Sequence, residues 1–290
     1  MITVNLFTSG RHTQPLIKAL EEAKNVKLVN IYEKLPDLSA DFVGRRPLRR
    51  PKAEALAKAD IFIVADFGQI IPKKILEIPE YGALCVHPSL LPKYRGASPV
   101  PQAILNGERE TGVTIFKMDE KVDHGPIIAQ FKRKIRNDDT AETLLIRLFT
   151  LGSQLLLKIL PDYFAGKIKP AEQNHAQATY THILKKEDGK INCLDLKEAM
   201  EAGGPKAVEI ERKIRALTPW PGAWTTIHPR GGVAPAAHLG GEKRLKLLKA
   251  HLEPSIPHTK LVLDEAQLEG KKPVSWKQFC EGYKTDLSKD

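Results

Sequence analysis

The sequence predicts an α/β protein in which an N-terminal doubly wound, mostly parallel sheet is followed by a small C-terminal β-barrel. In the first half, apolar runs typical of buried strands alternate with segments of helical period, which favours parallel strands joined by crossover helices. In the second half, short strand candidates are separated by glycines, prolines and charges, a pattern typical of a small barrel. A chain of 290 residues suits two domains better than one.

The elements of the first half follow from periodicity and from capping residues. Leu16, Leu20 and Ala23 recur at helical spacing, and Asp139 with Glu142 three residues later predicts the start of a long helix. Apolar or alternating runs bounded by turn residues predict strands. We expect strands over 2–7, 26–32, 60–67, 82–87, 111–119 and 125–135, and helices over 15–23, 98–107 and 143–160.

A polar stretch without strong periodicity, beginning after Pro161, separates the two halves of the chain. It predicts a first domain over 1–172, a linker over 173–181 and a second domain over 182–290. In the second domain we expect one helix over 207–217 and strands over 223–228, 244–252 and 260–267.

Charge and cysteine content indicate the partners and the compartment. Lys and Arg outnumber Asp and Glu by 45 to 35, and the net charge of +10 fits either a nucleic-acid partner or an ordinary soluble basic protein. Cys85, Cys193 and Cys280 are too scattered for a disulfide framework or a metal motif, so we expect a reducing, cytoplasmic setting and no metal. We expect no membrane association, because no apolar run approaches the ~18 residues of a span and the N-terminus lacks signal-peptide features.

The segment VHPSLLPKYRG, residues 86–96, is too irregular for a helix and too rich in proline for a central strand. His87 in this segment and Asp123 both follow predicted strands, where ligands bind on doubly wound sheets. A carboxylate beside a histidine orients the ring, which then moves protons near neutral pH. Each residue also has a structural explanation, a strand-end hydrogen bond for His87 and an ordinary Asp-His-Gly turn for Asp123.

The segment from His87 to Gln130 resembles the methionyl-tRNA formyltransferases, within the wider family that uses 10-formyltetrahydrofolate. SLLPKYRG is similar to that family's signature loop, and TGVTIFKMDEKVDHGPII to the strand pair that carries its catalytic aspartate. ATYTHILKKEDGKIN and IRALTPWPGAWTT resemble the linker and the beginning of the second domain. The resemblance implies a formyltransferase catalytic domain followed by an OB-like, tRNA-binding barrel.

The resemblance also implies a reaction and a set of site residues. The α-amine of methionine on initiator tRNA attacks the formyl carbon of 10-formyltetrahydrofolate, and tetrahydrofolate leaves. His87 matches the family histidine that stabilises the oxyanion or passes a proton, and Asp123 matches the aspartate that holds the histidine. The implied substrate and folate site comprises Phe67, Gly68, Gln69, Ile70, Ser89, Leu90, Leu91, Pro92, Arg95, Gly96 and Asp119.

One position departs from the family pattern, because Cys85 stands where the family has asparagine. An asparagine amide is a fixed donor toward an oxyanion, whereas a thiol is only a weak donor. Three interpretations are open: the enzyme is slow, another donor such as Gln69 substitutes, or the thiol is a transient formyl acceptor. A tRNA-binding relative impaired in catalysis is a further alternative.

Basic residues in both domains predict contacts with tRNA. The stretch between the second and third strands is shorter than the family usually has but retains an arginine cluster, whose position matches a family loop that enters the acceptor-stem groove. We expect a monomer that binds folate and initiator methionyl-tRNA; a sugar-nucleotide N-formyltransferase is the alternative. The candidate tRNA-binding residues are Arg45, Arg46, Arg49, Arg50, Lys185, Lys186 and Lys190.

Overall fold

The computed structural model describes residues 1–36, 56–227, 229–231 and 242–285. The chain divides into two compact units. The first comprises Met1–Val100, Arg109–Ile135 and Thr143–His182, and the second comprises Pro101–Glu108, Arg136–Glu142 and Ile183–Asp290. The segment predicted as a linker, 173–181, therefore lies within the first unit, which ends at His182.

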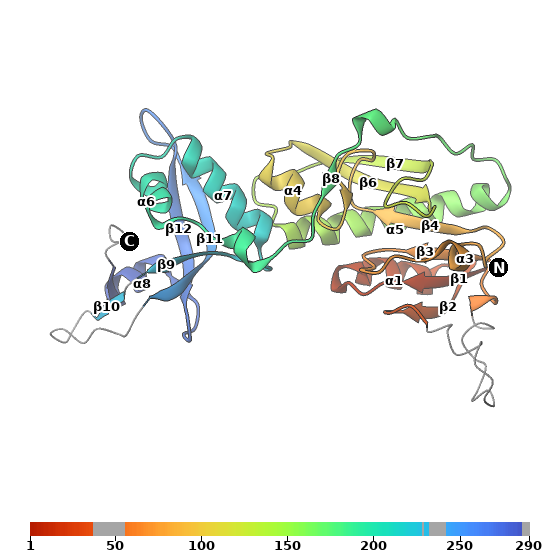
Figure 1. Cartoon of the computed structure of the whole chain (residues 1–290), viewed down its shortest axis with the longest axis horizontal. Coiled ribbons are helices and arrows are strands. Elements are labelled where there is room, and N and C mark those ends of the chain that lie inside the picture. The colour runs from red at the N-terminus through yellow and green to blue at the C-terminus, as the bar shows by residue number, and fades with distance from the viewer. Residues whose placement is uncertain (37–55, 228, 232–241, 286–290) are drawn as a thin grey trace. The chain divides into compact units, whose positions relative to one another are not determined.

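The first unit is built on a six-stranded sheet with the strand order β2-β1-β3-β4-β6-β7 (Figure 1). The first four strands pair in parallel, whereas β6 runs antiparallel to β4 and β7 antiparallel to β6. The prediction of a doubly wound, mostly parallel sheet is therefore confirmed. The strands are β1 (Ile2–Phe7), β2 (Val26–Tyr32), β3 (Ile61–Val64), β4 (Ala83–His87), β6 (Glu110–Lys117) and β7 (Ile127–Lys134).

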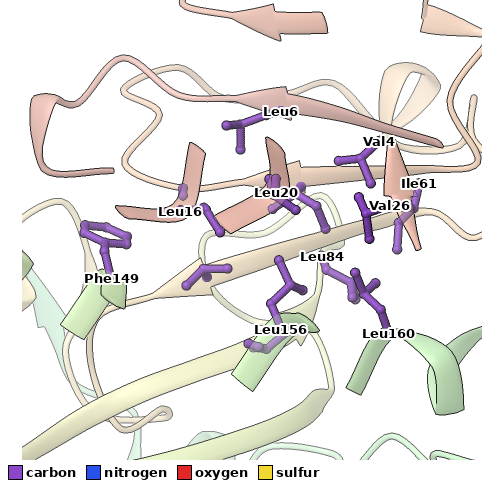
Figure 2. Close-up of a cluster of buried hydrophobic side chains, with 14 of the residues drawn as sticks. Val4, Leu6, Leu16, Leu20, Val26, Ile61, Leu84, Phe149, Leu156 and Leu160 are labelled. Atoms are coloured by element: carbon purple, nitrogen blue, oxygen red, sulfur yellow. The ribbon is translucent and has the colours of Figure 1, made fainter. Parts of the chain in front are cut away.

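Side chains alternate between the two faces of the sheet along each buried strand, so both faces carry apolar side chains. Both faces are covered. One face packs on helices α1 (Gln14–Glu22) and α5 (Ala141–Phe164), and Figure 2 shows Leu20 and Leu156 among the strand side chains. The other face packs on α3 (Lys73–Leu76) and aromatic residues. The remaining elements described are α4 (Pro99–Leu105), the short strands β5 (Arg95–Gly96) and β8 (Tyr180–Thr181), and the 3-10 turns η1 (Arg11–Thr13) and η3 (His175–Gln177).

Helix α5 corrects one expectation from the sequence. With 24 residues it is long and apolar enough to cross a membrane by length and composition alone, although we expected no such segment. Phe149, Leu156 and Leu160 are fully or almost fully buried against the sheet. Ile146 lies on the exposed side of the same helix, as expected for an amphipathic helix that covers a sheet.

The second unit contains the predicted small β domain. Its strands form an antiparallel sheet in the order β13-β12-β11-β9 and a separate β10-β14 pair. Two helices that we did not predict are present: Asn192 caps α6 and Ser275 with Gln278 forms a capping box for α8. The elements are η4 (Lys186–Gly189), α6 (Cys193–Glu201), α7 (Pro205–Leu217), β9 (Ala223–Ile227), β10 (Pro229–Gly231), β11 (Lys243–Glu253), β12 (Lys260–Leu268), β13 (Val274–Ser275), α8 (Trp276–Gly282) and β14 (Tyr283–Thr285).

Replacing side chains on the two sides of α5 with alanine should have different effects on the free energy of unfolding. We expect Leu156→Ala to lower the free energy of unfolding by about 2–5 kcal/mol, because it removes apolar contacts and leaves a cavity in the core. Ile146→Ala on the exposed side should change it by about 0.5 kcal/mol or less. Urea unfolding followed by far-UV circular dichroism measures both, and equal effects of the two substitutions would contradict the packing of α5.

Candidate active site

Strand β4 delivers two candidate residues to the same face of the sheet. All five of its residues are buried, and alternation places Cys85 and His87 on the face opposite Leu84 and Val86. Cys85 lies level with Phe116 of β6, and His87 lies level with Thr114. The end of β4 therefore carries a buried imidazole immediately before the loop 88–96.

The hydrogen bonds of His87 fix which ring nitrogen carries a proton. Its Nε2 lies 3.0 Å from the carbonyl oxygen of Tyr94, which only accepts hydrogen bonds, so Nε2–H is the donor. In the neutral ring the lone pair then resides on Nδ1, which lies 3.6 Å from Oδ2 of Asp123. The unprotonated nitrogen of the neutral ring therefore faces the carboxylate.

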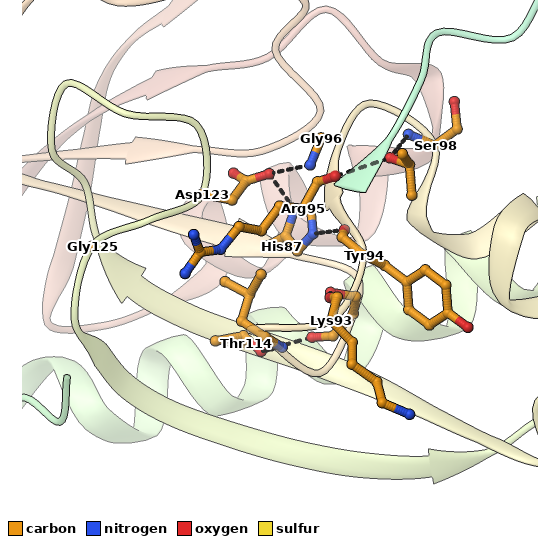
Figure 3. Close-up of polar contacts among 12 residues, drawn as sticks. His87, Lys93, Tyr94, Arg95, Gly96, Ser98, Thr114, Asp123 and Gly125 are labelled. Atoms are coloured by element: carbon orange, nitrogen blue, oxygen red, sulfur yellow. Dashed lines mark hydrogen bonds and ion pairs between the residues drawn. The ribbon is translucent and has the colours of Figure 1, made fainter. Parts of the chain in front are cut away.

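The Asp123 side chain is held through one of its two oxygens. Oδ2 accepts a 2.7 Å hydrogen bond from the Gly96 N–H and also faces His87, as the dashed lines in Figure 3 show. Within the part of the chain that the structure describes, Oδ1 has no hydrogen-bond partner. Asp123 has a positive φ of 46°, a conformation that costs free energy in a residue other than glycine.

The loop 88–96 is pinned at several backbone groups. Ser89 Oγ donates to the carbonyl of Lys93, and Thr114 Oγ1 donates to the carbonyl of Ser89 and accepts from the N–H of Leu91. The Leu91–Pro92 peptide bond is cis, and Leu90 and Pro92 are half-buried. Gly96 has a φ of 106°, and a Cβ at this position would lie 2.7 Å from the carbonyl oxygen of Thr181. Only glycine therefore fits at this exit from the loop.

The thiol of Cys85 is buried among apolar side chains that include Phe7, Phe62 and Phe116. Burial raises its pKa well above the usual value, because the thiolate would lose its solvation, and the negative charge of Asp123 adds to the effect. The sulfur is consequently a neutral thiol at physiological pH, which argues against Cys85 as a nucleophile.

Arg95 is almost fully buried, with 1% of its surface exposed. Its guanidinium donates to Oε1 of Gln173, Nδ1 of His175 and the hydroxyl of Tyr180. These contacts, together with the β5–β8 ladder, attach the loop 88–96 to the segment 173–181. Arg95 therefore holds the loop 88–96 and the segment 173–181 together from a buried position and does not expose its charge to solvent.

The segment from Phe67 to Ile70 follows β3 and borders the same face of the sheet. Ile70 is 78% exposed and Phe67 is half-buried with its ring edge-on to Phe7. Gln69 accepts a 2.7 Å hydrogen bond from the N–H of Leu35 through Oε1, and the N–H of Gly68 donates to Ser9 Oγ. Apolar surface beside exposed backbone is chemically suited to a flat heterocyclic ring.

The remaining polar candidate, Asp119, is joined to two histidines that the sequence analysis missed. Asp119 Oδ2 lies 2.7 Å from Nδ1 of His124, whose ring stacks on His175 with the centroids 4.1 Å apart. Desolvation is the largest cause that lowers the pKa of His175, followed by its electrostatic interactions with His124 and Arg95. His124 directly follows Asp123 in the sequence, but the Asp-His-Gly turn gave no signal that its ring contacts residue 175.

The candidate tRNA-binding residues are only partly described. Lys185, Lys186 and Lys190 are exposed on the second unit, and Lys190 Nζ lies 5.9 Å from the ring centroid of Trp224. Arg45, Arg46, Arg49 and Arg50 lie outside the described residues. No group of three or more metal-ligating side chains occurs within the described ranges.

Sequence comparison gives two matches that together cover both units. A family model described as formyl transferase matches residues 11–160, and one described as formyl transferase, C-terminal domain, matches residues 205–261. A methionyl-tRNA formyltransferase from Methylacidiphilum infernorum is 39% identical over 246 residues, which cover 78% of this chain and 71% of that relative.

Solved structures share the fold. A methionyl-tRNA formyltransferase from Clostridium thermocellum has a TM-score of 0.60 at 19% identity, covering 95% of this chain and 100% of that chain. An N-formyltransferase from Helicobacter canadensis, in complex with folinic acid and dTDP-3-aminofucose, has a TM-score of 0.61 at 20% identity, covering 91% of this chain and 99% of that chain.

The burial of Cys85 predicts slow chemical modification. In the folded protein we expect iodoacetamide to alkylate Cys85 at least ~10²-fold more slowly than Cys280, because Cys85 is buried and its pKa is raised well above the usual value. Peptide mass spectrometry over a time course measures both sites. The two rates should converge in urea, whereas rapid native labelling of Cys85 would show that its thiol is accessible and ionisable.

Proposed function

The chain belongs to the methionyl-tRNA formyltransferase family, and we propose that His87 and Asp123 move the protons in its reaction. The enzyme transfers a formyl group from 10-formyltetrahydrofolate to the α-amine of methionyl-initiator tRNA. The observation that carries the assignment is the 3.6 Å pair between His87 Nδ1 and Asp123 Oδ2, in which Nδ1 can accept a proton and the second carboxylate oxygen, Oδ1, has no hydrogen-bond partner among the described residues.

Asp123 is proposed as the acceptor of the amine proton. An amine attacks a carbonyl carbon only through its lone pair, and its acidity rises as the new bond forms, so an adjacent carboxylate takes the proton as attack proceeds. Oδ2 is occupied by the Gly96 N–H, whereas Oδ1 is without a partner among the described residues. Oδ1 is therefore the oxygen that we expect to meet the amine.

His87 is proposed to stabilise negative charge that develops on the formyl oxygen. A proton on Nδ1 makes the ring a cation, and the Asp123 carboxylate beside it stabilises that cation. The Nε2–H bond to the Tyr94 carbonyl keeps the ring plane fixed in both protonation states. The same pair then returns a proton to the nitrogen that leaves with tetrahydrofolate.

Cys85 is proposed as a weak replacement for the family asparagine. Its buried, neutral thiol supports the interpretation of a slow enzyme over that of a covalent formyl acceptor. Gln69 stays a candidate for a substitute donor, because its Oε1 is bound by Leu35 and its amide nitrogen carries the remaining hydrogens.

The two substrates are assigned to different parts of the chain. We assign folate to the segment 67–70, the loop 88–96 and Asp119, where exposed apolar side chains lie near fixed backbone groups. We assign tRNA to the exposed lysines of the second unit and to the arginine cluster, as a complex formed by a monomer in the cytoplasm.

Substitution of the catalytic pair tests the assignment. We expect His87→Ala and Asp123→Asn each to lower kcat by at least ~10², because each removes a proton-transfer group. Formylation of charged initiator tRNA by 10-formyltetrahydrofolate is the measurement, with an amino-sugar nucleotide as the competing acceptor. Unchanged circular dichroism shows that the variants fold. Near-parental kcat in either variant would remove that residue from the mechanism. Preferential formylation of the amino-sugar nucleotide would reject methionyl-tRNA as the acceptor.

Charge removal tests the tRNA assignment. Replacing Lys185, Lys186 and Lys190 together with alanine should raise KM for tRNA and reduce the slope of log affinity against log salt by roughly one unit for each phosphate that is no longer neutralised. Replacing Arg45, Arg46, Arg49 and Arg50 should act in the same direction. Folate affinity should not change. An unaltered salt slope in either set would assign those side chains to a surface that does not contact tRNA.

A further inference from the structure

The side chain of Gln173 bridges the buried guanidinium of Arg95 and the backbone of the Asp123 turn. Gln173, which is 5% exposed, accepts hydrogen bonds from Arg95 Nε at 3.2 Å and Nη2 at 2.6 Å through Oε1. Its Nε2 donates to the carbonyl oxygens of Asp123 at 3.0 Å and Gly125 at 2.7 Å. Both lone pairs and both hydrogens of the amide are thus used, so its orientation is fixed.

This chain of contacts acts on a strained part of the backbone. Asp123 has a positive φ, and such a conformation persists only where surrounding contacts over-determine it. A guanidinium bound at Oε1 draws electron density from the amide and strengthens donation by Nε2. Gln173 therefore transmits the charge of Arg95 to the carbonyls on both sides of His124, including that of Asp123 itself.

We propose that Gln173 is a positioning residue for formyl transfer, which holds the Asp123 carboxylate against His87 by fixing the turn that carries it. This inference rests on the proposed role of Asp123 in the reaction. It goes beyond charge compensation for Arg95, because a side chain that only accepted hydrogen bonds would satisfy Arg95 equally well. The two functions of the amide can therefore be separated by changing its nitrogen alone.

The substitution Gln173→Glu makes that separation. A glutamate of the same shape still accepts from Arg95, as a charge-paired contact, but it presents an oxygen to the carbonyls of Asp123 and Gly125. We expect kcat to fall at least ~10-fold while KM for methionyl-tRNA stays within about twofold, because positioning affects the transition state more than binding. Gln177→Glu, an exposed change four residues further along, adds the same charge and should leave both parameters at parental values.

A second measurement does not depend on activity. The Gly96 amide donates to Asp123 Oδ2, so hydrogen exchange in a peptide covering residues 94–98 reports on the position of the carboxylate. Exchange at Gly96 should be at least ~10-fold faster in Gln173→Glu than in the parent or in Gln177→Glu.

Each outcome decides one of the two proposals. Parental kcat and parental exchange in Gln173→Glu would overturn the inference and leave Gln173 as a partner for Arg95 alone. Loss of activity in Asp123→Asn would still support the proposed function in that case. A parent protein without formyltransferase activity would reject the proposed function and the role of Gln173 in it, and the exchange measurement would then show only whether Gln173 holds the Asp123 carboxylate in place.

Discussion

The antiparallel pairing of β4 and β6 is the constraint on which the candidate site depends. His87 lies level with Thr114, whereas Lys117 at the end of β6 lies level with Leu84, three positions back along β4. The connection that follows β6 must therefore return toward His87 before it enters β7. At Asp123 this connection is held by the N–H of Gly96, which donates to the carboxylate, and by the amide of Gln173, which donates to the backbone carbonyl. Contacts outside the sheet, rather than strand order alone, complete the pair.

This constraint explains how much the sequence could predict. Period and turn residues located the strands and long helices of the first unit, because buried strands and amphipathic helices leave strong local patterns. α6 and α8 were missed, although Asn192 and Ser275 with Gln278 are capping signals, because their apolar positions are few. His87 and Asp123 were singled out by residue type and motif, whereas Gln173 and His124 act through contacts distant in the sequence. Local patterns contain no information about such contacts.

Cys85 illustrates a different limit. The sequence left the thiol as a possible donor, a bystander or a nucleophile, and residue type alone could not distinguish them. Its burial in an apolar cluster argues against the nucleophile alone, because loss of solvation and the nearby Asp123 carboxylate raise the pKa of the thiol. In the structure Cys85 belongs to the cluster of buried apolar side chains that contains Phe7, Phe62 and Phe116. The chemistry of this thiol therefore depends on side chains from neighbouring strands, which residue type alone does not reveal.

The two compact units interlace along the chain, which limits how they can be exchanged between proteins. Residues 101–108 and 136–142 group with the C-terminal unit, and the segment carrying Gln173 groups with the N-terminal one. A single crossover at residue 172 would therefore separate Asp123 from the amide that holds its turn. Chimaeras that carry a foreign C-terminal unit should be joined after His182. They should take residues 101–108 and 136–142 from the same protein as the C-terminal unit. Modular recombination of this fold requires several junctions rather than one.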